Sequence, residues 1–208
     1  MVIDHPIFLE SIRFIRSHLG ANDLNYLEKK VLERLVHTSG DFSVQNLVNF
    51  SEGACEKGLH ALKNGAPILT DTDMAAAAIK SMAENTTTRN KVFTARMWFG
   101  KNNHTNLTKT AYGLSEGWKE LSVMNSGSKS PIVVIGSSPT ALTYLIDILE
   151  NAKDLPSLII GMPVGFIGVE KSKNKLISTK HPKIVLNSTR GGAAMAAAAV
   201  NALLRETI

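Results

Sequence analysis

Residues 131–142, with the sequence PIVVIGSSPTAL, decide the fold. Their first part, Ile132–Ile135, is apolar at every position, as a central parallel strand covered by helices on both faces requires. Gly136 follows directly, Ser138 can cap a helix, and Pro139 suits the first helical position because its φ is preset. A buried strand that runs straight into a helix is the unit from which α/β sheets are built.

Further short apolar runs flank this strand, and they alternate with helical segments. We expect strands at Pro67–Thr70, Val92–Arg96, Ile132–Ile135, Leu158–Ile160 and Ile184–Leu186. We expect helices between and after them at Asp73–Met82, Thr110–Leu121, Pro139–Asn151, Val169–Leu176 and Gly191–Arg205. This alternation predicts a mostly parallel five-stranded sheet in a three-layer, doubly wound α/β fold.

The chain before the predicted sheet has a helical pattern. The predicted helices are Pro6–Leu19, Asp23–His37 and a third from its capping residue Ser51 to just before Gly65. None of them has the character of a strand, so the sheet is expected to start later. Because 208 residues favour one domain over two, we expect a single domain over 1–208, with a helical part at 1–65 and a sheet part at 66–208.

Composition excludes several classes of protein. Hydrophobic residues make up 44% of the chain and charged residues 20%, and no apolar run is long enough to span a membrane, so a globular protein with no membrane partner is expected. The N-terminus has no basic cluster followed by a cleavable apolar core, which predicts a cytoplasmic location. The lone cysteine, Cys55, excludes an internal disulfide and has no neighbours to complete a zinc site.

The net charge of +5 favours an anionic partner. Charge alone does not choose between nucleic acid, phosphate and a polycarboxylate. The basic residues are scattered and aromatic residues make up only 6%, so the alternation of cations and stacking residues typical of single-stranded nucleic-acid binding is missing. No nucleic-acid partner is therefore expected.

Three loops that follow predicted strands are candidate ligand sites, because parallel sheets bind ligands beyond the carboxyl ends of their strands. The turn at 136–140 has free N–H groups at a helix start, which attract a carboxylate or phosphate. Gly161–Gly168 is rich in glycine, which indicates close approach of the backbone to a ligand or another chain. Arg190-Gly191-Gly192 places a cation at a helix start, although a plain turn explains it equally well. None of these loops matches a P-loop, a dinucleotide fingerprint or a hydrolase nucleophile elbow.

Asp71 and Asp73 follow the first predicted strand. They can be interpreted as a metal-binding or acid–base pair, but Asp73 is also well placed to cap the next helix, and we favour capping. No metal site is therefore predicted.

His37 is the only strong candidate for proton transfer. It ends the second predicted helix, roughly 120° around it from the apolar stripe at about 100° per residue, and should point away from the core. Arg34 precedes it by three residues, so a fixed cation and a titratable imidazole can face one ligand. The alternative is a histidine that only interacts favourably with the helix dipole, and the residues by themselves favour that simpler interpretation.

In their order and spacing, these segments resemble the precorrin-8X (cobalt-precorrin-8) methylmutase family. Each motif is weak alone, but the similarity runs over nearly the whole chain. The segments that carry it are His5-Pro6-Ile7, Glu10-Ser11-Ile12, Arg34-Leu35-Val36-His37, Gly65–Asp71, Pro139–Leu142, Gly161–Gly168, Glu170–Lys173 and Arg190-Gly191-Gly192.

The resemblance implies an isomerase that moves a methyl group from carbon 11 to carbon 12 of a tetrapyrrole in cobalamin biosynthesis. The product is hydrogenobyrinic acid, or cobyrinic acid when the ring carries cobalt, and no cofactor is involved. The resemblance further implies flavodoxin-like homodimers whose site draws on both subunits. It assigns proton transfer to His37 and substrate contact to Ser11 and Arg34, and makes substrate-binding candidates of Lys109, Ser137, Thr140, Gly165 and Arg190.

Two motifs depart from the family pattern. Relatives commonly have Gly-Asn-Ala-Pro-Thr-Ala-Leu where this chain has Ser137 and Ser138, which keeps a polar side chain but changes its reach. Relatives commonly show Thr-Arg-Ser-Ala where this chain has Thr108-Lys109-Thr110-Ala111, so a bidentate guanidinium contact becomes a point charge. These differences affect individual carboxylate contacts more than the reaction class.

The alternatives to this assignment are a non-catalytic tetrapyrrole carrier, a nucleotide-dependent α/β enzyme and a basic nucleic-acid-binding protein. The residues do not show whether the natural substrate already contains cobalt, because the macrocycle rather than the protein would hold the metal.

Overall fold

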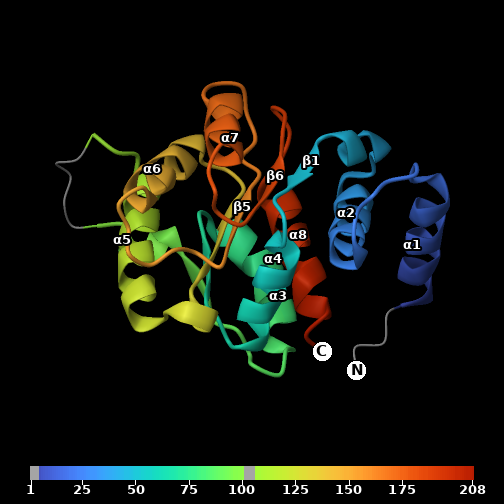
Figure 1. The fold of residues 1–208 in the computed structure, drawn as a ribbon, viewed down its shortest axis with the longest axis horizontal. Helices are drawn as coiled ribbons and strands as arrows, with labels where there is room; N and C mark the ends of the chain where they lie inside the picture. The colour runs from blue at the N-terminus through green and yellow to red at the C-terminus, as the bar shows by residue number, and fades with distance from the viewer. Residues whose placement is uncertain (1–4, 101–105) are drawn as a thin grey trace.

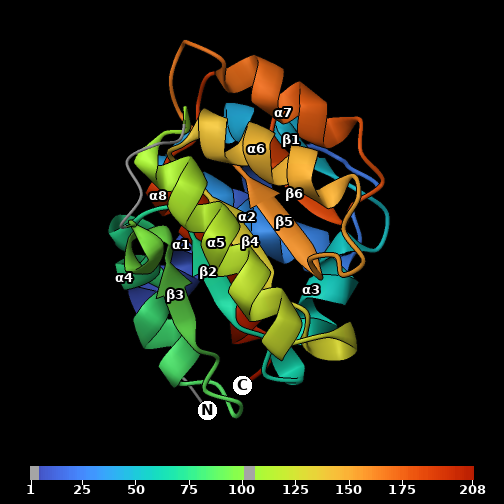
Figure 2. The ribbon, with the colours of Figure 1, turned by 90° about the vertical axis from the view of Figure 1, so that its left-hand side faces the viewer.

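The computed structural model describes residues 5–100 and 106–208, within which a six-stranded sheet lies between helices (Figures 1 and 2). The strands are β1 (Val48–Phe50), β2 (Ile68–Thr70), β3 (Val92–Thr94), β4 (Ile132–Ile135), β5 (Leu158–Gly161) and β6 (Lys183–Leu186). The α-helices are α1 (Pro6–His18), α2 (Tyr26–Ser39), α3 (Ala54–Lys63), α4 (Asp73–Glu84), α5 (Lys109–Met124), α6 (Pro139–Leu149), α7 (Val169–Ile177) and α8 (Ala193–Arg205). The predicted α/β class is confirmed.

The strands lie in the order β1-β6-β5-β4-β2-β3. β2 to β6 are parallel to one another, whereas β1 pairs antiparallel with β6, with Val48 opposite Leu186. The prediction of five strands, all after the N-terminal helices, is therefore wrong, because β1 comes from the N-terminal part. β1 has only three residues and Asn49 at its centre, so it lacks the apolar run that marked the buried strands.

Both faces of the sheet are covered by helices, because alternate strand residues enter different cores. Ile132 and Val134 of β4 pack in one core with α3, α4 and α8, and Val133 and Ile135 pack in another with α5, α6 and α7. Figure 2 shows α5 and α6 in front of the sheet. All of β4 is buried, and each such side chain stabilises the fold by about 1.5–3 kcal/mol.

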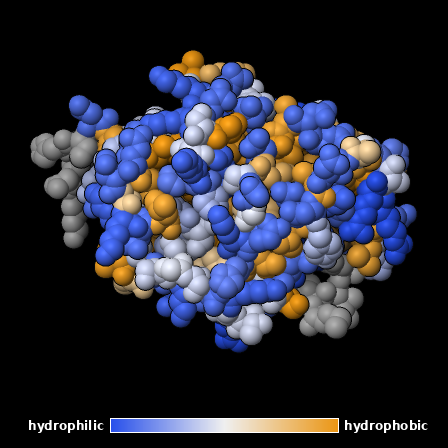
Figure 3. Space-filling view, in the orientation of Figure 1, coloured by the Kyte–Doolittle hydropathy of each residue, from blue (hydrophilic) through white to orange (hydrophobic). Residues whose placement is uncertain are grey.

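The N-terminal helices form an additional layer outside α8. α2 packs on α8 and α1 packs on α2, so α1 lies farthest from the sheet (Figure 1). α2 begins after Asn25, whose side chain accepts from the N–H of Glu28 while the Glu28 side chain accepts from the N–H of Asn25. Among residues 5–100 and 106–208, no helix combines the length and apolar character that a membrane span needs. The surface facing the viewer in Figure 3 has hydrophobic residues interspersed with hydrophilic ones.

Ser51 has a different role from the one predicted. α3 begins after Gly53, which has a φ of 66° and provides no side-chain cap. The Ser51 hydroxyl instead accepts a hydrogen bond of 2.9 Å from the backbone N–H of Lys183. It therefore helps to hold β1 and the start of α3 against β6.

Candidate functional site

His37 is exposed in the last turn of α2, as predicted, and it contacts α1. The Ser11 hydroxyl lies 2.9 Å from His37 Nδ1, at hydrogen-bond distance. Phe8 meets the imidazole edge-on, with 5.2 Å between ring centroids. Two consecutive helices thus orient one titratable ring.

An ion pair fixes α1 against α2. Arg16 donates to Glu33 from Nε at 2.6 Å and from Nη2 at 2.8 Å, and Glu33 is only 7% exposed. A bidentate contact of this kind sets orientation as well as distance. Ile12 and Ile15 are buried beside it, so Ser11 is presented to His37 by a helix with a defined rotation.

Arg34 makes the surroundings of His37 electropositive. Its guanidinium carbon lies 4.7 Å from the centroid of the Phe8 ring, a cation–π contact. Burial and, to a smaller degree, the charge of Arg34 lower the pKa of His37. Burial also lowers the pKa of Arg34, whose Nε is buried without a hydrogen-bond partner in the described part of the chain. An anion bound beside these groups would favour protonation of His37.

Three backbone N–H groups of the turn between β4 and α6 are already bound within the chain. Asp71, at the end of β2, accepts hydrogen bonds from the backbone N–H groups of Gly136, Ser137 and Ser138 at 3.2, 2.7 and 2.9 Å. Burial raises the pKa of Asp71, and these donors oppose that shift. These three N–H groups are therefore not free for an external anion, although the Ser137 side chain is exposed.

Asp73 does not cap α4, contrary to the prediction. Thr72 is the capping residue, and its side chain accepts from the N–H of Ala75. Asp73 instead pairs with Arg96 at 2.9 Å on the surface. Asp71 and Asp73 therefore have separate structural partners.

Lys109 and Thr140 lie at the starts of α5 and α6. Thr108 caps α5, and its hydroxyl lies 3.0 Å from that of Thr140. The Thr140 hydroxyl also lies 3.1 Å from the hydroxyl of Ser138, which caps α6. Lys109, directly after Thr108, and Ser137, directly before Ser138, are both exposed.

Arg190 is already engaged within the chain. It contacts Asp41 Oδ2 at 2.5 Å and donates to the Ser43 hydroxyl at 2.8 Å. Hydrogen bonds from Ser43 and then from Arg190 lower the pKa of Asp41. The loop after β6 is thereby tied to the segment that follows α2.

Lys173, which was not predicted as a site residue, holds the same loop from inside the protein. It is fully buried and donates to the carbonyls of Ser188 and Arg190, both at 2.6 Å. Burial lowers its pKa to about 8. Its position between Val169 and Leu176 at helical spacing places it on the buried stripe of α7, and this was the signal available in the sequence.

Gly165 lies in the loop after β5, with a φ of 137° that favours glycine. Its N–H donates to the carbonyl of Thr189 at 3.0 Å. A cavity of about 370 Å³ beside it is lined by Val164, by Arg190 and by Thr38, the residue after His37. The end of α2 thus borders the loops at the carboxyl edge of the sheet.

The predicted site residues fall into three groups. Ser11, Arg34 and His37 are brought together between α1 and α2. Arg190 and Gly165 lie on loops that border the end of α2, and a third group comprises Lys109, Ser137 and Thr140. Within residues 5–100 and 106–208, no hydrogen bond or ion pair joins the third group to His37, and no cluster of three or more His, Cys, Asp or Glu residues could hold a metal ion.

This fold and these side chains define an α/β protein with a titratable histidine in electropositive surroundings. The model of the Precorrin-8X methylmutase family matches residues 6–206. The chain is 34% identical over 211 residues to a precorrin-8X methylmutase of Pseudomonas aeruginosa, covering 96% of this chain and 94% of the relative. It is 31% identical over 216 residues to a cobalt-precorrin-8 methylmutase of Synechocystis, covering 97% and 95%.

A solved structure of the precorrin-8X methylmutase from Thermus thermophilus is also similar, with a TM-score of 0.83 and 30% identity over 97% of this chain and 95% of that one. The chain therefore belongs to the precorrin-8X methylmutase family, whose members are isomerases.

Proposed function

We propose that this chain converts precorrin-8X, or its cobalt-containing analogue, by moving the methyl group on carbon 11 to carbon 12, with His37 as proton donor/acceptor. The observation that carries this proposal is the contact of Ser11 with His37 beside Arg34 and Phe8. The products would be hydrogenobyrinic and cobyrinic acid.

The reaction needs one proton transfer from the protein. Methyl migration is a concerted shift within a conjugated ring, so the protein needs to select the reactive tautomer by protonating one ring position. An imidazole provides such a general acid without a large change in pKa. Because Ser11 contacts Nδ1, Nε2 is the nitrogen left to give up the proton, which returns when the product forms.

The carboxylates of the substrate would be bound by the remaining predicted residues. Arg34 lies beside His37, while Lys109, Ser137 and Thr140 present polar groups at the starts of α5 and α6. Gly165 would allow the backbone to approach the ring. Arg190 would bind a carboxylate only by sharing or exchanging its contact with Asp41.

Substituting His37→Ala tests the catalytic role. Isomerisation of precorrin-8X and of its cobalt analogue should fall by about 10²–10⁴-fold, since a general acid contributes that much. Binding of hydrogenobyrinic acid, followed by its visible absorption, should change little. His60→Ala is the matched control, because His60 is also exposed in the last turn of a helix. Undiminished turnover by the His37→Ala variant would reject the catalytic role of His37, whereas a wild-type protein that binds hydrogenobyrinic acid but turns over neither substrate would be a tetrapyrrole carrier.

We also infer a single flavodoxin-like domain over 1–208. The five parallel strands, numbered in chain order, run 2-1-3-4-5, which is the flavodoxin order, and β1 joins the 1–65 part to the 66–208 part by pairing with β6.

We further propose a cytoplasmic homodimer with a site shared between subunits. Phe166 and Ile167, next to Gly165, are 89% and 90% exposed, and apolar side chains so exposed favour contact with another chain. Light scattering on a variant carrying Phe166→Ser and Ile167→Ser should show a smaller particle than the wild type. An unchanged mass would remove this loop from the interface.

A further inference from the structure

Phe8 lies in the first turn of α1 and was not among the predicted site residues. It precedes Ser11 by three residues, so the two side chains are neighbours on one face of the helix. Ser11 contacts His37 through its hydroxyl, and Phe8 contacts the same imidazole through its ring. The first turns of α1 therefore make two contacts of different kinds with the titratable group.

These two contacts restrict the imidazole in different ways. The Ser11 hydroxyl fixes the position of one atom, Nδ1, and the ring can still turn about that atom. The Phe8 ring lies at 85° to the imidazole, with 5.2 Å between centroids, which is the edge-to-face geometry that aromatic pairs prefer. Because this geometry depends on the angle between two planes, it fixes the plane of the imidazole. Once Nδ1 and the plane are both fixed, the direction of Nε2 is fixed as well.

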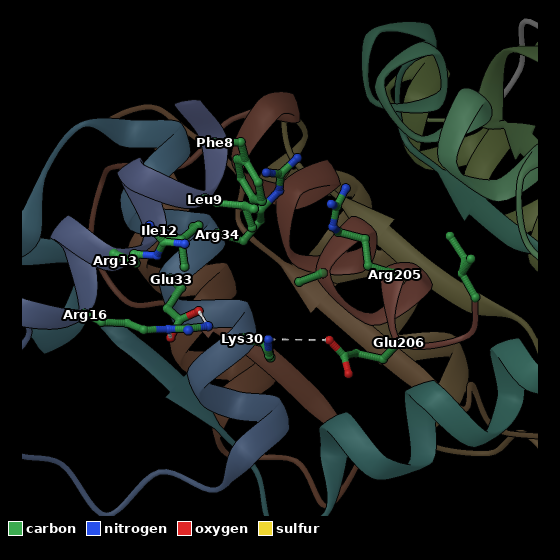
Figure 4. A pocket seen from close by; sticks show the side chains of 12 residues that line it. Phe8, Leu9, Ile12, Arg13, Arg16, Lys30, Glu33, Arg34, Arg205 and Glu206 are labelled. Carbon is green, nitrogen blue, oxygen red and sulfur yellow. Dashed lines mark hydrogen bonds and ion pairs between the residues drawn. The ribbon is translucent and has the colours of Figure 1, made fainter. Parts of the chain in front are cut away.

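The same ring contacts the guanidinium of Arg34. The guanidinium carbon lies 4.7 Å from the Phe8 centroid, and a cation at this distance is attracted by the ring face. Figure 4 shows both side chains among those that line a cavity of about 330 Å³ between α1, α2 and α8. Arg205 of α8, on which the charge of Glu206 also acts, lies 5.1 Å from the same centroid. The half-buried ring is thus in contact with side chains of two other helices, which hold it beside His37.

We propose that Phe8 is a positioning residue for the proton transfer, whose ring sets the direction of His37 Nε2 and keeps the Arg34 guanidinium beside it. Phe8 has no group that exchanges a proton or pairs with a carboxylate, so its effect passes through these two side chains. An error in the direction of Nε2 lowers the rate because proton transfer requires the donor within hydrogen-bond reach of the ring position. The inference rests on the proposed function, because it requires that His37 transfers the proton.

Phe8→Leu tests this role, because it keeps an apolar side chain on α1 and removes the ring. The kcat for precorrin-8X should fall about 3- to 10-fold, the change that corresponds to loss of one aromatic contact. Binding of hydrogenobyrinic acid should weaken about 2- to 5-fold, because Arg34 loses its cation–π contact. Phe8→Tyr keeps the ring at a half-buried position and should restore both quantities to within about 2-fold of the wild type.

Phe14→Leu is the matched control, because it makes the same substitution on the same helix beside a different histidine. The Phe14 ring lies 4.1 Å from that of His18 and 6.4 Å from that of Phe42, between centroids. This variant should keep the wild-type kcat and affinity. Urea unfolding of both variants should give similar midpoints, so that a difference in rate reflects the site and not the stability of α1.

A second comparison separates positioning of His37 from any other effect on the rate. Added to His37→Ala, Phe8→Leu should lower the residual kcat no further, because no imidazole is left to position. A further fall in that background would overturn the proposal, as would a wild-type kcat in Phe8→Leu alone or an equal fall in Phe14→Leu. Failure of the proposed function is distinguishable from these results, because His37→Ala by itself would then keep the wild-type rate.

Discussion

The region between α1 and α2 and the carboxyl edge of the sheet both carry polar side chains, but they use them differently. At the sheet edge, Asp71 satisfies three backbone N–H groups, and Lys173 donates to two backbone carbonyls. Beside α1 and α2, His37 is exposed and a buried donor of Arg34 has no partner in the described chain. Pairing within the chain holds the loops in place, and the groups left over are those that can act on a ligand.

The largest expected effect is the loss of the Asp71 contacts. Asp71→Ala leaves three N–H groups without their acceptor, and should lower the free energy of unfolding by about 3 kcal/mol or more. Urea unfolding measures this change. Asp73→Ala, two residues later, removes only an exposed ion pair and should cost less than about 1 kcal/mol. Similar losses in the two variants would mean that the sheet edge is not held by Asp71.

The titration of Lys173 should make the free energy of unfolding depend on pH. Its pKa is about 8 in the folded protein against an ordinary 10.5, so between these values the folded state releases a proton that the unfolded state keeps. Raising the pH through this window therefore favours the folded state, by up to about 3 kcal/mol. The difference in unfolding free energy between wild type and Lys173→Met should grow in favour of wild type from pH 8 to 10.5, and a constant difference would contradict a buried, titrating ammonium.

Ser11→Ala tests the region between α1 and α2. Loss of the contact with Nδ1 should reduce isomerisation about 2- to 10-fold, since one hydrogen bond contributes roughly 0.5–1.5 kcal/mol. Ser17→Ala is the control, because Ser17 lies on the same helix, donates to the Phe14 carbonyl and lies 3.1 Å from Nδ1 of the neighbouring His18. The rate should respond to the first substitution and not to the second.

The smallest expected effect is a shift in titration. Arg34→Gln removes a positive charge that lowers the pKa of His37, so this pKa should rise, although burial, the larger cause, remains. NMR titration of the imidazole measures the shift directly. If His37 donates a proton, the pH at which kcat/KM begins to fall should also move upward in this variant. Substrate binding is measured separately, so that a change in affinity is not mistaken for a change in pKa. A shift in the opposite direction would show that Arg34 does not act through charge.

Much of the fold was predictable because its signals are local. Ile132–Ile135 was placed at its observed bounds, since an apolar run closed by a glycine and a helix start needs no distant partner to be recognised. β1 was missed because three residues become a strand only by pairing with β6. The bonding of the turn at 136–140 was not predicted for the same reason, because its acceptor, Asp71, directly follows another strand.

The sequence by itself determined the α/β class, the position of His37 on an exposed helical surface and, through the order of its motifs, the family. Only the tertiary structure decided which polar groups are paired within the chain and which remain for a ligand. The physical reason is the separation in sequence of the interacting residues, because helical and strand periodicity depend on neighbours a few residues apart. The contacts of Ser11 with His37, of Asp71 with Ser137 and of Arg205 with Phe8 instead join segments that only folding brings together.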